Sequence, residues 1–160
     1  MKEGSIFSAC VDGRYILKFV GDVRLTLCAT LDCHIEESLA SIDAQEILVD
    51  LTEAEGIDST SLGLIAKLSI KAYALSLPKP TVVSTNENIT RVLMSMGFDH
   101  IFVLISELPT CPSDLKKLSF VQDSEESIRM RIIAAHRILI DLNDSNREAF
   151  KDLVKTLEKS

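Results

Sequence analysis

Apolar residues recur along the chain at two periods, one typical of strands and the other typical of helices. Asp12-Gly13 lies between two short apolar runs and is a strong signal for a β-hairpin. A third run, residues 46–51, is almost continuously apolar, as expected for a strand that is buried on both faces. The predicted strands are residues 6–11, 15–20, 46–51, 80–84 and 101–105.

Segments with helical spacing of apolar residues separate and follow these strands. Residues 60–77 are apolar nearly all round, which is typical of a helix packed deeply against a sheet, and Pro78 and Pro80 end it. Gly97 closes the next helix, and the segment 21–24 is expected to end the second strand. The predicted helices are residues 25–39, 60–77, 86–96 and 125–142, followed by a short one with Phe150, Leu153, Val154 and Leu157 on its apolar side.

Strands that alternate with helices at short spacing predict an α/β fold with a small, mixed, mainly parallel sheet and crossover helices. The first hairpin adds an antiparallel edge. We expect this domain to cover residues 1–107 and a proline-containing linker to cover residues 108–122.

Residues 123–160 predict a C-terminal helical hairpin, in which Asp123 with Glu126 and Ser145 with Glu148 resemble capping boxes. Its apolar stripes need a surface to bury against. That surface is the domain, a second copy of the chain in a homodimer, or a partner.

The composition argues against two classes of partner. A net charge of −7, with the basic residues scattered, argues against nucleic-acid binding. Residues 1–21 lack the pattern of a secretory signal, and no apolar run is long enough to span a membrane, so a cytoplasmic protein is expected.

The cysteines form no CxxC or zinc pattern and are interpreted as small buried thiols: Cys10, Cys28, Cys33 and Cys111.

No motif for catalysis is present, so we expect no enzyme, no catalytic residue and no cofactor. Ser59 is not in a GxSxG elbow, and the chain has neither a Walker loop nor GxGxxG. His136 is interpreted as a core or interface residue of the C-terminal hairpin. His34 and Glu37 are spaced to share a metal, but they lie with Asp32 and Glu36 on what is more simply a solvated helix face, so no metal site is predicted.

Four small polar residues, Asp58 to Ser61, precede or begin the most apolar helix. Any of the first three can cap the free N–H groups of its first turn, which is the ordinary role of such residues. The same position favours an added anion, because the helix dipole is positive there. A hydroxyl at this corner is therefore suited to carry a phosphate.

The order of "GDVR", "ILVDLTEAEGIDSTSLG", "PTVVST" and "ITRVLMSMGFDHIFVL" resembles the STAS domain of bacterial anti-sigma-factor antagonists. "IDSTSLG" resembles the family's D-S-[ST]-G-L-G, in which a partner kinase phosphorylates the Ser that follows the Asp. The resemblance implies a STAS fold and a phosphorylation site at Ser59. It also implies that the "GDV" loop lies near this serine.

The resemblance further implies a partner switch, in which the chain binds an anti-sigma factor or a kinase-like regulator while Ser59 is unphosphorylated. Two positions depart from the family: Ser61 replaces a Gly, and Arg24 replaces an Asp that helps phosphorylation. Arg24 either pairs with a phosphate on Ser59 or is a plain surface arginine. The expected partner interface comprises Asp22, Arg24, Asp58, Thr60, Ser61, Leu62 and Asn86.

The C-terminal extension resembles a proteobacterial subgroup of antagonists that controls biofilm formation, motility or stress responses. In that subgroup a serine kinase and a PP2C-type phosphatase often belong to a response regulator, and magnesium and ATP would belong to the kinase. The alternative is an unphosphorylated STAS-like scaffold or accessory subunit beside lipid- or anion-transport machinery.

Overall fold

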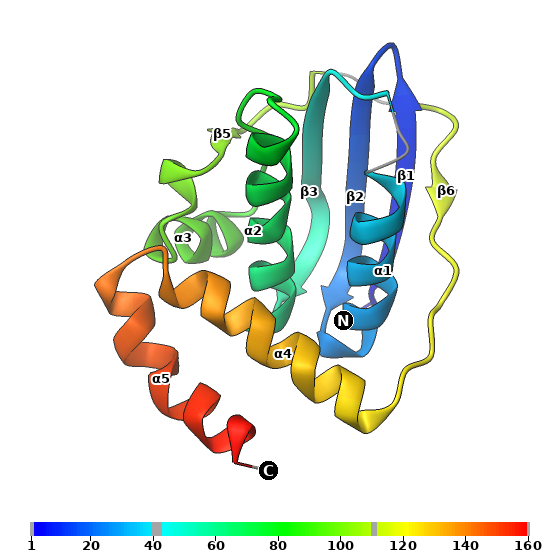
Figure 1. Cartoon of the computed structure of the whole chain (residues 1–160). Coiled ribbons are helices and arrows are strands. Elements are labelled where there is room, and N and C mark those ends of the chain that lie inside the picture. Colours follow the sequence, from blue (N-terminus) through cyan, green and yellow to red (C-terminus); the bar gives the residue numbers. More distant parts are fainter. Residues whose placement is uncertain (1, 40–42, 110–111, 160) are drawn as a thin grey trace.

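The computed structural model describes residues 2–39, 43–109 and 112–159, and its centre is a six-stranded sheet in the order β5-β4-β3-β2-β1-β6 (Figure 1). Helices cover one face of this sheet. The strands are β1 (Ser5–Val11), β2 (Arg14–Val23), β3 (Glu46–Ile57), β4 (Thr81–Val83), β5 (Val103–Ile105) and β6 (Lys116–Lys117). The helices are α1 (Cys28–Ser38), α2 (Ser59–Ala74), α3 (Glu87–Ser95), α4 (Glu125–Ile140) and α5 (Asp144–Glu158), with 3-10 turns at Leu25–Leu27 and Phe98–His100.

The parallel strands follow one another across the sheet in chain order. β2, β3, β4 and β5 are neighbours in chain order, and each consecutive pair is parallel and joined through a helix. Since such crossovers are right-handed, α1, α2 and α3 are placed on the same face of the sheet. The predicted α/β fold with a mainly parallel sheet is confirmed.

The β1–β2 hairpin turns where the sequence predicted it. Asp12 and Gly13 have φ angles of 52° and 79°, as a two-residue turn with left-handed residues requires. β1 is not the edge of the sheet, however, because β6 pairs with it antiparallel, with Phe7 opposite Lys117. The linker therefore contributes a strand that its two lysines did not indicate.

Alternating side chains of β2 divide the core into two unequal parts. Tyr15, Leu17 and Phe19 join the main core beneath the helices. Ile16 points to the opposite face, where it forms a small cluster with Leu48 and Val83. Ile105, Leu108 and Leu115 pack against that cluster, so the chain around and after β5 covers the second face.

The ends of two neighbouring strands were predicted too early. β2 does not end at Val20, because Asp22 and Val23 still pair with Gly56 and Ile57 after a register shift. β3 consequently runs to Ile57 rather than stopping at Leu51. The two strands thus extend together to the residues that precede α2.

The caps of the C-terminal helices also differ from the prediction. Ser124 caps α4 by accepting a hydrogen bond from the N–H of Ser127 at 3.1 Å, so Asp123 is not the cap. Asn143 caps α5 by accepting from the N–H of Asn146 at 2.7 Å, so Ser145 is not the cap. Each predicted box placed the cap one or two residues from its true position.

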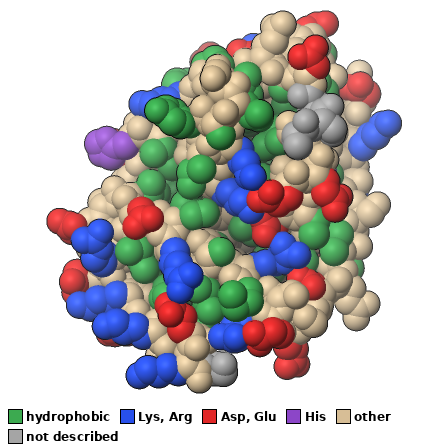
Figure 2. All heavy atoms as spheres, viewed as in Figure 1, with side chains coloured by type: hydrophobic (Ala, Val, Ile, Leu, Met, Phe, Trp, Pro, Cys, Tyr) green, Lys and Arg blue, Asp and Glu red, His purple; other side chains and the backbone are tan. Residues whose placement is uncertain are grey.

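The C-terminal hairpin, defined as α4 and α5 with their turn, packs on the domain itself. α4 crosses in front of α1 and α2 (Figure 1), and its Ala135 and Leu139 are buried in the main core. A Cβ atom on Gly63 of α2 would lie 2.3 Å from the carbonyl oxygen of Ala135, so the two helices are in backbone contact. On this face acidic and basic side chains lie interspersed (Figure 2).

Gly63→Ala tests this helix contact. Alanine is the better helix former, but its methyl group would overlap the Ala135 carbonyl and force α4 away. We expect a net loss of about 1–2 kcal/mol in the free energy of unfolding, measured by urea denaturation. Tyr73→Ala on the same helix, where the side chain is 88% exposed, should change it by less than about 0.5 kcal/mol. A stabilised Gly63→Ala protein would contradict the packing.

Candidate functional site

Ser59 is the first residue of α2, and Asp58 before it holds the surrounding corner together. One oxygen of Asp58 accepts a hydrogen bond from the N–H of Ser61 at 2.9 Å, which caps the helix. The other accepts from the N–H of Leu25 at 2.6 Å. The carboxylate therefore ties Leu25, the residue after the Gly21–Arg24 segment, to the start of α2.

The residues after Ser59 face inward. Thr60, Ser61 and Leu62 are only 2–3% exposed, whereas Ser59 and Asp58 are half-buried. The side chains of Thr60, Ser61 and Leu62 therefore support the corner from inside. Asp58 and Ser59 are the more exposed residues of this corner.

Arg24 and Asn86 are engaged within their own segments. The Nε of Arg24 lies 2.8 Å from a carboxylate oxygen of Asp22, and this ion pair raises the pKa of the guanidinium. Asn86 caps α3 by accepting from the N–H of Asn88 at 2.9 Å. A shallow hollow of about 210 Å³, lined in part by Arg24, Leu62 and Asn88, joins the two segments. Two of the predicted interface residues, Arg24 and Leu62, thus share this hollow.

A contact that the sequence did not predict joins Ser59 to the C-terminal hairpin. The Oγ of Ser59 lies 2.8 Å from the Nε2 of His136 in α4, a residue 77 positions away. The Nδ1 of His136 lies 2.8 Å from the carbonyl oxygen of Ile132. Since a carbonyl only accepts, Nδ1 carries the hydrogen, and in the neutral ring Nε2 accepts the hydroxyl proton of Ser59.

This serine–histidine pair lies in the interface between α2 and α4. His136 is 1% exposed, and its ring meets the ring of Phe150 edge-on with the centroids 5.0 Å apart. Its second nitrogen bonds a backbone carbonyl, not a carboxylate. The sequence identified His136 correctly as a buried residue, but no local spacing could have shown its contact with Ser59.

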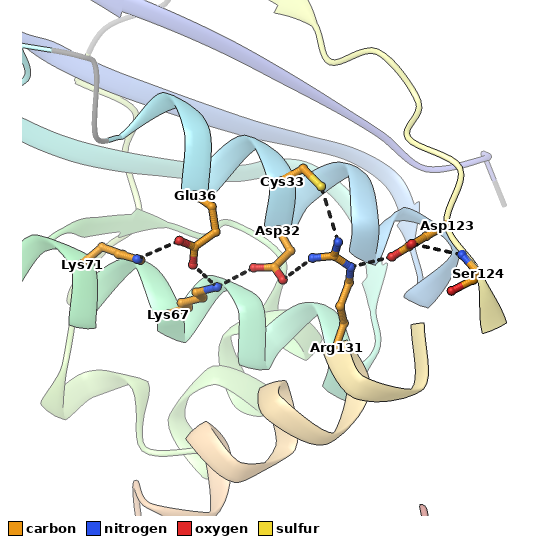
Figure 3. Close-up of polar contacts among 8 residues, drawn as sticks. All are labelled: Asp32, Cys33, Glu36, Lys67, Lys71, Asp123, Ser124 and Arg131. Carbon is orange, nitrogen blue, oxygen red and sulfur yellow. Dashed lines mark hydrogen bonds and ion pairs between the residues drawn. The ribbon is translucent and has the colours of Figure 1, made fainter. Parts of the chain in front are cut away.

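A chain of charged groups fixes α4 to α1 and α2 (Figure 3). Asp32, predicted on a solvated face, is only 8% exposed because Lys67 and Arg131 both reach it at 2.6 Å. Arg131 also donates to Asp123 at 2.8 Å, and these bonds raise its pKa. Burial lowers the pKa of Lys67, but the bonds to Asp32 and Glu36 outweigh it and raise the value.

The predicted absence of a metal site remains a prediction. Within residues 2–39, 43–109 and 112–159, no group of three His, Cys, Asp or Glu side chains is arranged to hold an ion. Of the cysteines, Cys28 is buried, Cys33 is half-buried and Cys10 is exposed, so the prediction of buried thiols was wrong for Cys10. Cys111 lies outside the described residues.

A larger hollow, about 960 Å³, opens at the carboxyl ends of β4 and β5. Ser84, Thr90, Arg91 and Glu107 are among its lining residues, and neither Ser59 nor His136 is. No helix among the described segments has the length and apolar character to cross a bilayer.

Several solved structures are similar to this chain. A protein assigned as an anti-sigma factor antagonist from Thermotoga maritima matches with a TM-score of 0.56 and 24% identity, over 63% of this chain and 86% of that one. SpoIIAA, an anti-sigma factor antagonist in its unphosphorylated form, matches with a TM-score of 0.54 and 10% identity, over 65% of this chain and 89% of that one. An anti-sigma factor antagonist from Mycobacterium paratuberculosis matches with a TM-score of 0.53 and 22% identity, over 68% of this chain and 87% of that one.

Neither a protein-family model nor a curated protein matches the sequence. At these identities the structural matches establish the fold, which confirms the predicted STAS-like architecture. The matched share of this chain is about two thirds, so roughly a third of it lies outside each comparison.

Asp32→Asn tests the charged contacts that hold α4. Removing the carboxylate leaves Arg131 and Lys67 without their shared, largely buried partner, so we expect a loss of about 2 kcal/mol in the free energy of unfolding. Glu126→Gln removes an exposed carboxylate that pairs with Arg129 on α4 and should cost less than about 0.5 kcal/mol. Equal effects of the two substitutions in urea denaturation would show that Asp32 contributes no more than a surface charge.

His34 should make stability depend on pH. Burial lowers the pKa of its imidazole below the ordinary value, and its Nε2 has no hydrogen-bond partner among the described residues. The unfolded chain therefore binds the proton more readily, and stability falls as the pH drops below about 6.5. His34→Phe should give a shallower fall between pH 7 and pH 5 in denaturant titrations. An unchanged slope would assign the acid sensitivity to other groups.

Proposed function

We propose that this protein is an anti-sigma-factor antagonist that switches partners according to the phosphorylation state of Ser59. The observation that carries the proposal is the position of this hydroxyl at the start of α2, where Asp58 joins the helix to the Asp22–Arg24 segment. The STAS-like fold shared with known antagonists supports the same reading.

The proposed binding surface comprises Asp22, Arg24, Asp58, Ser59 and Asn86. Thr60, Ser61 and Leu62 belong to it as the buried support beneath these groups. Unphosphorylated protein binds an anti-sigma factor or a kinase-like regulator through this surface. A phosphate on Ser59 adds about −1.5 to −2 charges beside the Asp58 carboxylate and opposes that contact.

The opposing activities come from other proteins. A serine kinase adds the phosphate and a PP2C-type phosphatase removes it, in a cytoplasmic pathway that controls biofilm formation, motility or stress responses, as in the proteobacterial subgroup. The kinase supplies its own magnesium and ATP. This chain contributes the acceptor hydroxyl and the surface that surrounds it.

A second function, that of an unphosphorylated scaffold or transport accessory subunit, is favoured by one observation. The Ser59 hydroxyl is half-buried and already bonded to His136, as a purely structural serine would be. A scaffold would bind its partner equally well with Ser59 replaced by Ala.

Affinity for the anti-sigma partner, measured by calorimetry with phosphoserine installed genetically at position 59, tests the switch. An unpaired charge in an interface costs roughly 2–5 kcal/mol, so binding should weaken roughly 30-fold to several thousand-fold. Ser59→Ala should retain binding within about 3-fold. Phosphoserine at Ser145, an exposed position on α5, is the matched charge control and should also retain it. Equal affinities of all forms would refute the switch and favour the scaffold.

A further inference from the structure

The C-terminal hairpin is held over Ser59 by polar contacts at three separate points. The first is the pair of Arg131, at the middle of α4, with Asp32 of α1. The second, nearer the C-terminal end of α4, is the bond between His136 and Ser59. At the turn to α5, the side-chain amide of Asn146, which is 3% exposed, donates to the carbonyl oxygen of Met96 at 2.9 Å. The closed position is therefore fixed from the middle of α4 to the first turn of α5.

Only the second contact depends on the chemical state of a modifiable group. In the neutral ring, the hydrogen between Ser59 and His136 comes from the serine, since the hydrogen of the ring is committed to the Ile132 carbonyl. The ester oxygen of phosphoserine has no hydrogen to donate. Two acceptors would then face each other at 2.8 Å, so the contact would turn from attractive to repulsive.

The helix interface is close-packed next to Ser59. One turn beyond Ser59, Gly63 is in backbone contact with Ala135, the residue that precedes His136. The charged neighbours of the corner are unfavourable as well: Asp58 carries a like charge, and Arg24 is already paired with Asp22. A phosphate on Ser59 therefore favours separation of α2 and α4, which would let the phosphate face solvent.

We propose that the C-terminal hairpin is an in-chain cover of the Ser59 hydroxyl and of the adjoining faces of α1 and α2, beside the proposed partner surface rather than over it, and that its closed position requires unphosphorylated Ser59. Transfer of a phosphoryl group needs the serine released from His136, and the phosphate then keeps α4 from returning. Phosphorylation would change which part of α1 and α2 is open to partners, besides adding charge. This inference rests on the proposed phosphorylation of Ser59.

Hydrogen–deuterium exchange of the full chain tests the proposal without the kinase, when phosphoserine is installed genetically at position 59. We expect protection of the α4 amides to fall by about 100-fold or more, because a charged group loses its place in a closed interface. Protection of β2 and β3 should stay within about 3-fold of the unmodified protein. Ser59→Ala, which loses only one hydrogen bond, should lower α4 protection by about 2- to 10-fold.

Phosphoserine at Ser145 is the charge control and should leave α4 within about 3-fold of the unmodified protein. Equal or greater α4 protection with phosphoserine 59 than with Ser59→Ala would overturn the proposal, because it would mean that a protonated His136 holds the phosphate in the closed position. Loss of protection in β2 and β3 together with α4 would also overturn it, since the hairpin would not open separately. A partner affinity that responds to phosphoserine 59 while α4 stays protected would refute the cover and leave the switch intact.

Discussion

The close approach of α4 to α2 is the contact on which the rest of the C-terminal third depends. Gly63 lets the backbone of α4 lie directly against α2, which brings His136 to Ser59 and Arg131 to Asp32. A larger residue at position 63 would separate the helices and remove both polar contacts. The apolar stripe of α4 is thereby buried in the same core as the sheet, so the hairpin is part of the domain in this structure.

The same contact places a helix of the chain itself against the proposed site. Here Ser59 is half-buried, and its hydroxyl has a specific partner. A switch at this serine would act on two interactions at once: the surface for an external partner and the seating of the chain's own helix. The two effects share one atom, which couples them physically.

Local signals in the sequence were sufficient for most of the fold. Asp12-Gly13 predicted the hairpin because only a few residue types tolerate two left-handed conformations in succession. The apolar periods predicted α2, and Gly97 was correctly placed at the end of α3, where it adopts a left-handed conformation. Errors arose where pairing, not pattern, decides: β6 and the extension of β2 through Val23 exist because a neighbouring strand supplies hydrogen bonds.

The sequence by itself therefore determined the order of the elements and the place of Ser59 at a helix start, since caps, turns and periods are properties of adjacent residues. Only the tertiary structure decided that Asp32 is buried and that His136 meets Ser59, because their partners are distant in the chain: Arg131 for one, Ser59 for the other. Such contacts depend on how two helices pack together. The need for a residue as small as Gly63 follows only from the position of the opposing backbone at Ala135.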